Sequence, residues 1–247
     1  MEIVFLDTNL LYALLLENDA HHELAQKTIA KLLENQTPII LPEAVYRDLR
    51  RSFHRKYLNA ETYLIYFYRK ALRLGLKKEK DIYSYVEKNF IDFAMQHDKK
   101  SLNMYQYLLN YIKENKLFSK EKRALLVQTL DNHVVELISK LKPVEEQTIH
   151  LTLGDKELDL YKDIYDKISS IFKNETDAEI FCQIAASIAN EEETEEIQYK
   201  LYTVDKEFAK IGNKAVEILN KEGYSINLEI VYLSESQNKQ SFTRSKV

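Results

Sequence analysis

The chain has 247 residues, of which 45% are hydrophobic, and it carries a formal net charge of −4 with a single cysteine, Cys182. This length suits one large domain or two small ones, and one cysteine excludes a disulfide framework. No apolar run reaches the ~20 residues of a membrane span, and no basic segment precedes the first apolar run. We therefore expect a cytoplasmic protein without a membrane partner, and the low Gly and Pro content predicts many helices.

The first elements are short and apolar. Ile3–Leu6 is predicted to be a central strand, after which Thr8 or Asn9 caps a helix. A second helical stretch covers His21–Leu33, and Pro38–Leu41 is predicted to be a second buried strand. A basic helix is expected to run on from Glu43, with Pro42 tolerated in its first turn.

The middle of the chain is predicted to be helical throughout, from about Tyr57 to Leu141. Apolar residues recur there every three or four positions, and no segment has the alternation of a strand. Between Arg50 and Glu146 there are 20 Lys and Arg residues against 12 Asp and Glu residues. A basic middle within an acidic chain indicates an anionic partner such as nucleic acid.

The C-terminal third alternates strands with helices again. The predicted elements are a strand at Thr148–Leu153, a helix ending at Phe172, a helix at Asp177–Ala189, a strand at Lys200–Val204, a helix at Phe208–Lys221 stopped by Gly223, and a strand at Asn227–Leu233. The acidic run Glu191–Glu196 is expected to be an exposed helix end or loop, and the polar residues from Ser234 are expected to be disordered. Strands alternating with helices predict an α/β fold with a mostly parallel sheet.

Four carboxylates stand beside these predicted elements. Asp7, Glu43 and Asp205 lie at or just past the ends of apolar runs, and Asp177 opens an apolar helix. In a parallel sheet the strand C-termini share one edge, where ligands bind. Carboxylates gathered there need a cation, and an all-oxygen cluster suits Mg²⁺ or Mn²⁺. Asn9, Thr203 and Glu207 are close enough in sequence to support these ligands.

Each acidic residue has a plainer explanation when taken alone. Asp177, or Thr176 before it, could cap a helix, Asp205 could belong to a turn, and Glu43 could favour the helix dipole. The four together favour metal-assisted phosphodiester hydrolysis, in which a metal-bound water attacks the phosphate. The sequence has no glycine-rich nucleotide-binding loop, and its histidines have no zinc-ligand spacing.

A basic helix face follows the second predicted strand. Arg47, Arg51 and Arg55 share this face by four-residue spacing, so we expect them to contact RNA phosphates. Tyrosines interleave with the basic residues that follow, namely Tyr63, Tyr66, Tyr68, Tyr83 and Tyr85. Exposed tyrosines would stack on unpaired bases, whereas tyrosines at helical spacing also suit a core, and the region also suits a protein partner or a dimer.

These segments resemble PIN domains. The resemblance rests on Asp7-Thr-Asn after an apolar strand, Leu-Pro-Glu43, Thr-Asp177-Ala before an Ala-rich helix, and Thr203-Val-Asp205-Lys-Glu207-Phe208. It implies a three-layer α/β/α sandwich with a five-stranded parallel sheet. It also implies a Mg²⁺- or Mn²⁺-dependent endoribonuclease with Asp7, Glu43, Asp177 and Asp205 as ligands. The family includes VapC-type toxins, so an antitoxin or other inhibitor protein and a homodimer are further implied partners.

The chain departs from the compact members of that family in its middle, where roughly 90 extra residues intervene. We therefore expect a discontinuous PIN-like core at 1–56 and 147–234, an all-α insertion at 57–146 and a polar tail at 235–247. Two alternatives remain open. One is a non-catalytic PIN-like scaffold that binds RNA or protein, and the other is a DNA-acting 5′-nuclease.

Overall fold

The computed structural model describes residues 1–189 and 197–234. The predicted acidic run at Glu191–Glu196 and the predicted tail lie outside these residues. The chain divides into two compact units. We call the first, which contains Met1–Leu14, Glu23–Arg50 and the chain from Lys142, the sheet unit. We call the second, which contains Leu15–His22 and Arg51–Leu141, the helical unit. Leu15–His22, expected in the core, thus belongs to the helical unit.

A five-stranded parallel sheet forms the centre of the sheet unit, which confirms the α/β prediction. The strands are β1 (Glu2–Leu6), β2 (Ile39–Pro42), β3 (Thr148–Leu151), β4 (Gln198–Thr203) and β5 (Leu228–Tyr232). Their order across the sheet is β3-β2-β1-β4-β5, and all four pairings are parallel. Pro42 ends β2 rather than opening the next helix. The central β1 is almost wholly buried because both of its faces are covered, which explains its continuous apolar run.

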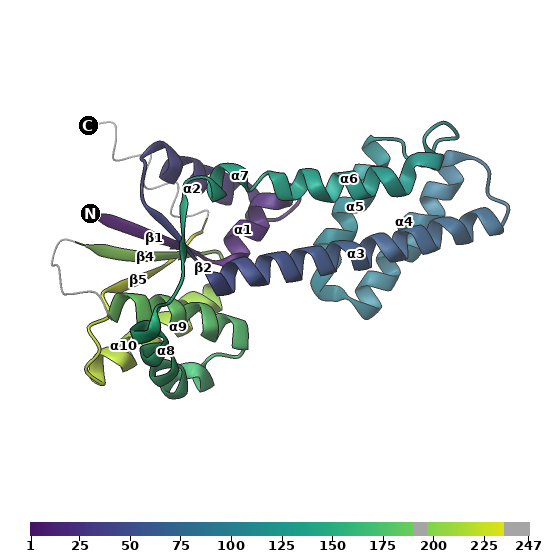
Figure 1. The fold of residues 1–247 in the computed structure, drawn as a ribbon. Coiled ribbons are helices and arrows are strands. Elements are labelled where there is room, and N and C mark those ends of the chain that lie inside the picture. The colour runs from purple at the N-terminus through teal and green to yellow at the C-terminus, as the bar shows by residue number, and fades with distance from the viewer. Residues whose placement is uncertain (190–196, 235–247) are drawn as a thin grey trace. The chain divides into compact units, whose positions relative to one another are not determined.

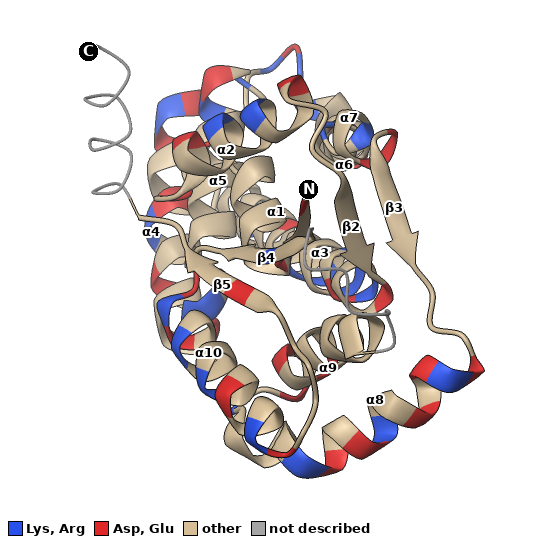
Figure 2. Ribbon diagram, turned by 90° about the vertical axis from the view of Figure 1, so that its left-hand side faces the viewer, with Lys and Arg blue, Asp and Glu red and all other residues tan. Residues whose placement is uncertain are grey.

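Helices cover both faces of this sheet. Those of the sheet unit are α1 (Thr8–Leu15), α2 (His22–Glu34), α7 (Lys142–Glu145), α8 (Asp155–Ile168), α9 (Glu175–Ala189) and α10 (Lys206–Lys221). Figures 1 and 2 both show α1 and α2 on one side of the sheet and α8 to α10 on the other. This arrangement is compatible with the expected three-layer sandwich. Gly223 has a φ of +93° directly after α10, as expected of a residue that ends a helix.

The helical unit consists of helices, as its periodicity predicted. Its main elements are the later part of α3 (Glu43–Arg73), α4 (Glu79–His97), α5 (Leu102–Glu114) and α6 (Leu126–Ser139). The basic helix and the next predicted helical segment form one 31-residue helix, α3, because no Gly or Pro interrupts them. It ends at Arg73, and Gly75, two residues further along, has a φ of +81° and closes the last turn. In the described parts of the chain, no helix combines the length and apolarity needed to cross a bilayer.

Candidate active site

Asp7 follows β1 at the edge where the strand C-termini meet. Its backbone N–H donates to the Tyr202 carbonyl of β4 at 3.0 Å, so the residue is held beside the neighbouring strand. The Asp7 side chain is only 1% exposed. Thr203 Oγ1 donates to Asp7 Oδ2 at 2.6 Å, and Asn9 Nδ2 donates to the same oxygen at 3.3 Å. Burial nevertheless raises the pKa of Asp7 to about 6, against the lowering effect of these bonds.

Thr203 connects Asp7 to the next acidic residue. Its hydroxyl is fully buried, donates to Asp7 and accepts a hydrogen bond from the Asp205 backbone N–H at 2.9 Å. The parallel register of β1 and β4 pairs Leu6 with Tyr202. One residue further along each strand, that register brings Thr203 beside Asp7. A small hydroxyl-bearing residue is needed here because one side chain must both donate to a carboxylate and accept from an amide.

Asp205 is the N-cap of α10. Its Oδ1 accepts hydrogen bonds from the backbone N–H groups of Glu207 and Phe208, at 2.8 and 3.0 Å. Asp205 therefore does have a local structural role, which its place in the sequence also allowed. Both bonds end on Oδ1, so the cap does not use Oδ2. The first turn of α10 also fixes where that second oxygen lies.

Asp177 stands in the first turn of α9, which Asn174 rather than Thr176 or Asp177 caps. Asn174 Oδ1 accepts from the Thr176 N–H at 3.1 Å, and Asn174 Nδ2 donates to Asp177 Oδ1 at 3.1 Å. The pKa of Asp177 is raised to about 7, first by burial and then by the charges of Asp7, Asp205 and Asp48. Negative charge from three other carboxylates thus converges on Asp177.

Asp48 is the acidic residue that sequence reasoning missed. It lies on α3, and its charge raises the pKa of Asp177 after the larger effects of burial, Asp7 and Asp205. Glu43 is exposed and faces Arg47 at 4.0 Å, one helical turn along. The available signal was helical spacing: Asp48 follows the buried Ala44 and Val45 by four and three residues, so it lies towards their inward side.

The remaining predicted residues fall into different surroundings. Arg47 is ion-paired with Glu179 of α9, in addition to its contact with Glu43. Arg51 and Arg55 are exposed and belong to the helical unit. Glu207 is exposed at the start of α10 and pairs with Lys173. The structure therefore brings Asp7, Asp177, Asp205, Thr203 and Asn9 together, and leaves Glu43 and Glu207 paired with cations nearby.

The donor chemistry of this edge suits a hard divalent cation. The groups present are carboxylates, and the buried Thr8 Oγ1, next to Asp7 in sequence, has no hydrogen-bond partner in the described part of the chain. An orphaned buried oxygen beside mutually repelling carboxylates is a polar site that lacks a positive charge. As the side chains stand, no three His, Cys, Asp or Glu residues within 1–189 and 197–234 are grouped closely enough to hold a metal.

Comparison of the chain with protein-family models, curated proteins and solved structures gave no match. Its function is therefore argued from the site itself.

Replacing Thr203 by Val tests whether its hydroxyl holds the site together. We expect the free energy of unfolding to fall by about 1–3 kcal/mol, because the substitution keeps the shape and removes the hydrogen bonds of the hydroxyl to the Asp7 carboxylate and the Asp205 N–H. Chemical denaturation of the wild type and the variant measures this. Thr62→Val, at an exposed position of the helical unit, is the control and should change stability little. Equal stabilities of Thr203→Val and wild type would contradict the bridging role.

Replacing Asp177 by Asn tests the repulsion among the carboxylates. The folded-state pKa of about 7 exceeds the ordinary value of 3.8, so the folded protein holds this proton more tightly than the unfolded chain. Stability due to this group is present at low pH and is lost as the pH rises from about 4 to about 7. In EDTA at pH 8 we expect Asp177→Asn to raise Tm by roughly 4 °C.

The gain should shrink as the pH falls towards 4 and vanish below it, where Asp177 becomes protonated in both the folded and the unfolded state. Thermal melts of both proteins across this pH range measure the effect. Asp166→Asn, on the exposed side of α8, provides the control and should show no such pH-dependent gain. A gain in Tm that is the same at pH 4 and pH 8 would argue against the electrostatic explanation.

Proposed function

We propose that this protein is a metal-dependent endoribonuclease of the PIN type. The observation that carries the proposal is the convergence of charge on Asp177, where Asp7, Asp205 and Asp48 all raise its pKa. Proteins maintain such mutual repulsion where the charges are used, and a strand edge at the switch point between β1 and β4 is the usual place for a ligand. The resemblance of the motifs to PIN domains supplies RNA as the expected substrate.

Two carboxylates are suited to hold the cation. Asp7 and Asp205 are immobilised by hydrogen bonds to one oxygen each, Oδ2 and Oδ1 respectively, so we assign them as the main ligands of Mg²⁺ or Mn²⁺. We assign to Asp48 the role in this acidic site that the sequence analysis expected of Glu43. The bound ion would supply a nucleophilic water and neutralise charge on the scissile phosphate.

Asp177 is suited to handle the proton. Without a bound cation its pKa is about 7, raised first by burial and then by the neighbouring acids, and a carboxylate with a pKa near neutral pH is an efficient proton acceptor. In the proposed hydrolysis a water oxygen forms a bond to phosphorus, the water proton passes to Asp177, and the ester P–O bond breaks with its pair of electrons going to the leaving oxygen, which takes a proton from solvent. Thr203 and Asn9 orient Asp7 and take no part in the bond changes, so they are positioning residues. An antitoxin and a homodimer remain predictions that follow from the resemblance alone.

The alternative is a PIN-like scaffold that binds RNA or protein without cleaving it. One observation favours it: within the described residues, no three potential ligands are grouped to hold a metal as they stand. The two functions differ in one measurable property, which is metal-dependent hydrolysis. A DNA-acting nuclease differs from both in its substrate, so the same assay separates all three.

The first experiment is cleavage of labelled single-stranded RNAs and DNAs with Mn²⁺, Mg²⁺ or EDTA. We expect RNA to be cut only with a metal, and the rate to fall on the order of 100-fold or more in Asp7→Asn, because the cation loses a ligand. Asp166→Asn should cut at the wild-type rate. Folded wild-type protein that cuts nothing would favour the scaffold, and preferential cutting of DNA would overturn the assignment of RNA.

A second comparison decides which acidic residue of α3 belongs to the site. We expect Asp48→Asn to lower the cleavage rate on the order of 10–100-fold, the usual cost of losing a group that supports a metal site. Glu43→Gln should change the rate less than about threefold, because Glu43 is exposed and faces Arg47. Rates measured under identical metal and RNA concentrations give the answer. The reverse order would restore Glu43 as the ligand.

A further inference from the structure

One side of α3 in the helical unit is exposed and carries cations and aromatic rings. We call it the α3 face, and its exposed residues recur every three or four positions: Arg55, Asn59, Tyr63, Tyr66, Lys70 and Arg73. The opposite side of α3 is buried, with Tyr57, Leu64 and Ala71 fully covered. The α3 face therefore does not belong to the core of the helical unit. It spans 19 residues of helix, or roughly 27 Å.

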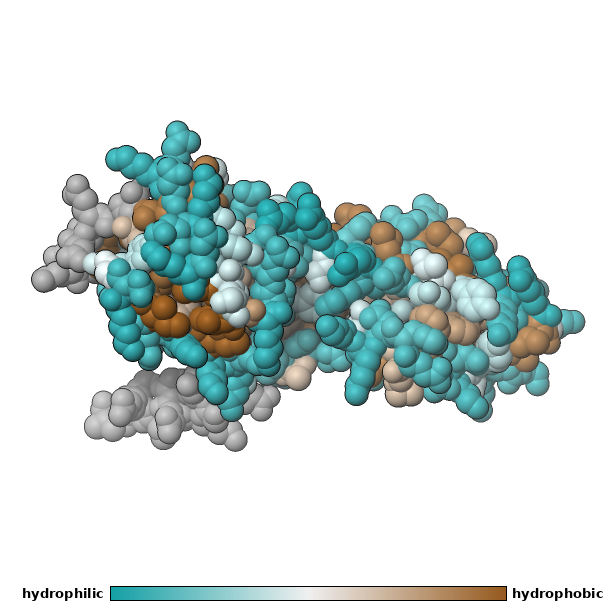
Figure 3. Space-filling view, turned by 90° about the horizontal axis from the view of Figure 1, so that it is seen from below, coloured by the Kyte–Doolittle hydropathy of each residue, from teal (hydrophilic) through white to brown (hydrophobic). Residues whose placement is uncertain are grey.

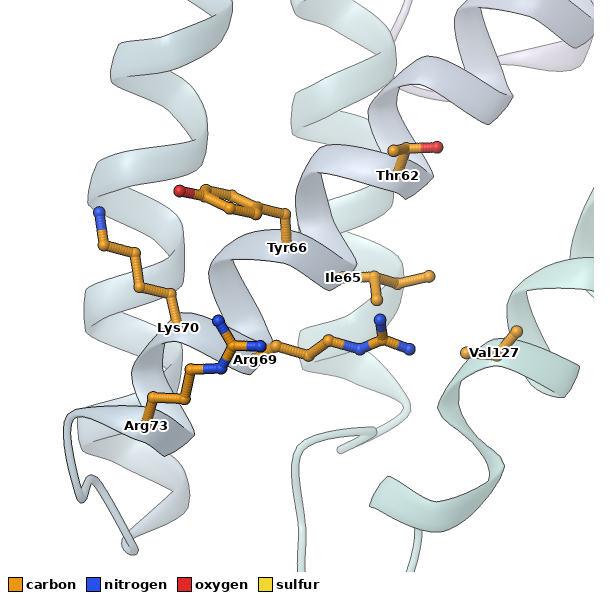
Figure 4. Close-up of a pocket in the computed structure, with 7 residues that line it drawn as sticks. All are labelled: Thr62, Ile65, Tyr66, Arg69, Lys70, Arg73 and Val127. Carbon is orange, nitrogen blue, oxygen red and sulfur yellow. The ribbon is translucent and has the colours of Figure 1, made fainter.

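A pocket of about 560 Å³ opens on this face (Figure 4). Lys70 and Arg73 of the α3 face supply two positive charges, Arg69 beside that face supplies a third, and Tyr66 supplies an aromatic ring. Thr62, Ile65 and Val127 of α6 complete the lining. No carboxylate lines the pocket. Three cations around one opening with no lining acid form a site for an anion.

These positive charges are not balanced in the described part of the chain. No ion pair involving Arg69, Lys70 or Arg73 is found there, and the only acid on α3 beyond Arg51, Glu61, is 6% exposed. Cations also favour the negative end of a helix. The last carbonyls of α3 are already satisfied, however, because Leu74, Gly75 and Leu76 donate their backbone N–H groups to them. The side chains are thus not needed as helix caps.

Tyr66 makes the pocket suitable for a planar ligand group. Its ring is 52% exposed although it stands within a packed helical unit. Lys70 Nζ lies 6.0 Å from the ring centroid, so the positive charge and the aromatic face are presented together. A nucleotide has a phosphate for the cations and a base for the ring. An acidic peptide would use the charges and leave the ring unused.

A second pocket of about 430 Å³ lies nearer the start of the α3 face and also combines cations with aromatic rings, although the acid Asp98 is among its lining residues. It is lined by Arg55 and by Tyr63, whose ring centroid lies 3.9 Å from that of Phe93. The hydroxyl of Tyr105, which also lines this pocket, is buried and has no hydrogen-bond partner in the described residues. An unpartnered buried hydroxyl marks a place where a ligand oxygen or nitrogen completes the bonding.

The surface of the helical unit is mixed, with exposed apolar side chains such as Leu58, Leu74 and Val127 among its polar residues. Hydrophilic residues predominate on the helical unit in Figure 3, and apolar residues lie in small groups between them. Tyr68, one of the tyrosines considered for stacking, is 7% exposed and stacks on Phe118, so it belongs to the core. Tyr63 and Tyr66 are the two of that set with exposed rings.

We propose that the α3 face binds a single-stranded nucleic acid, with phosphates at Arg69, Lys70 and Arg73 and a base stacked on Tyr66. The proposal rests on the proposed function only in expecting RNA rather than DNA. Binding needs neither the carboxylates of the sheet unit nor a metal, so it can be tested apart from cleavage. In this proposal the α3 face binds the nucleic acid whether or not the sheet unit cleaves it.

The experiment is fluorescence anisotropy of a labelled single-stranded RNA with the full chain in EDTA, at several salt concentrations. The triple variant R69Q/K70Q/R73Q removes the three cations. Because each phosphate contact contributes about 0.7 to the slope of log K against log salt for single strands, we expect the slope to fall by about 2. The matched control is K88Q/K116Q/K120Q, which removes three exposed lysines outside both pockets and should leave the slope nearly unchanged.

A second pair of variants tests stacking. Tyr66→Leu should weaken binding about tenfold without altering the salt slope, and Tyr66→Phe should bind like the wild type because the ring is kept. Circular dichroism confirms that each variant is folded. Loss of binding in Tyr66→Phe equal to that in Tyr66→Leu would overturn the assignment of a base to this ring.

Three further ligands identify what the α3 face recognises. Single-stranded DNA of the same sequence shows whether the α3 face prefers RNA or DNA, and binding of either would support the proposal. Duplex RNA should bind more weakly, since its bases are not free to stack. Binding of polyglutamate as tight as that of RNA would overturn the proposal in favour of an acidic protein. Equal losses in both triple variants, or no RNA binding at low salt, would also overturn it.

Discussion

The sheet unit depends on one buried charge. Asp7 ends the central strand with its carboxylate 1% exposed, held by the Thr203 hydroxyl of the neighbouring strand. Burying a carboxylate costs free energy, and hydrogen bonds offset only part of it, which is why the pKa of Asp7 stays raised at about 6. The Thr203 hydroxyl also accepts from the Asp205 amide, so the register of β1 and β4 and the start of α10 are joined to the same carboxylate.

This arrangement explains why a fold with few polar core residues keeps several acids at one sheet edge. Without a cation their repulsion lowers stability at neutral pH, and a bound cation would remove that penalty. Acids that lower the stability of the fold when no cation is bound are consistent with a function, because they do not serve to stabilise the fold. The helical unit carries the opposite charge on its α3 face, where cations stand without acidic partners.

Much of the fold follows from local pattern. Short apolar runs separated by helical periodicity indicate strands and helices whatever their neighbours, and Gly223 ends α10 because only glycine adopts a positive φ readily. The location of Asp7 could be predicted for the same reason. A residue directly after a central parallel strand lies at the edge of the sheet where the strand C-termini meet. Glu43 and Asp48 show the limit. Both lie on α3, and only the direction in which the helix packs decides which carboxylate turns towards Asp177.

The sequence by itself determined the parallel α/β sheet, the helical middle and the places of Asp7, Asp177 and Asp205 beside their strands and helices, because these depend on periodicity and on neighbours along the chain. The tertiary structure alone decided which acids converge, that Arg47 pairs with Glu179, and that Tyr66 is exposed while Tyr68 is buried. These outcomes depend on contacts between residues far apart in sequence. The order of residues along one helix does not show which of its faces the rest of the chain covers.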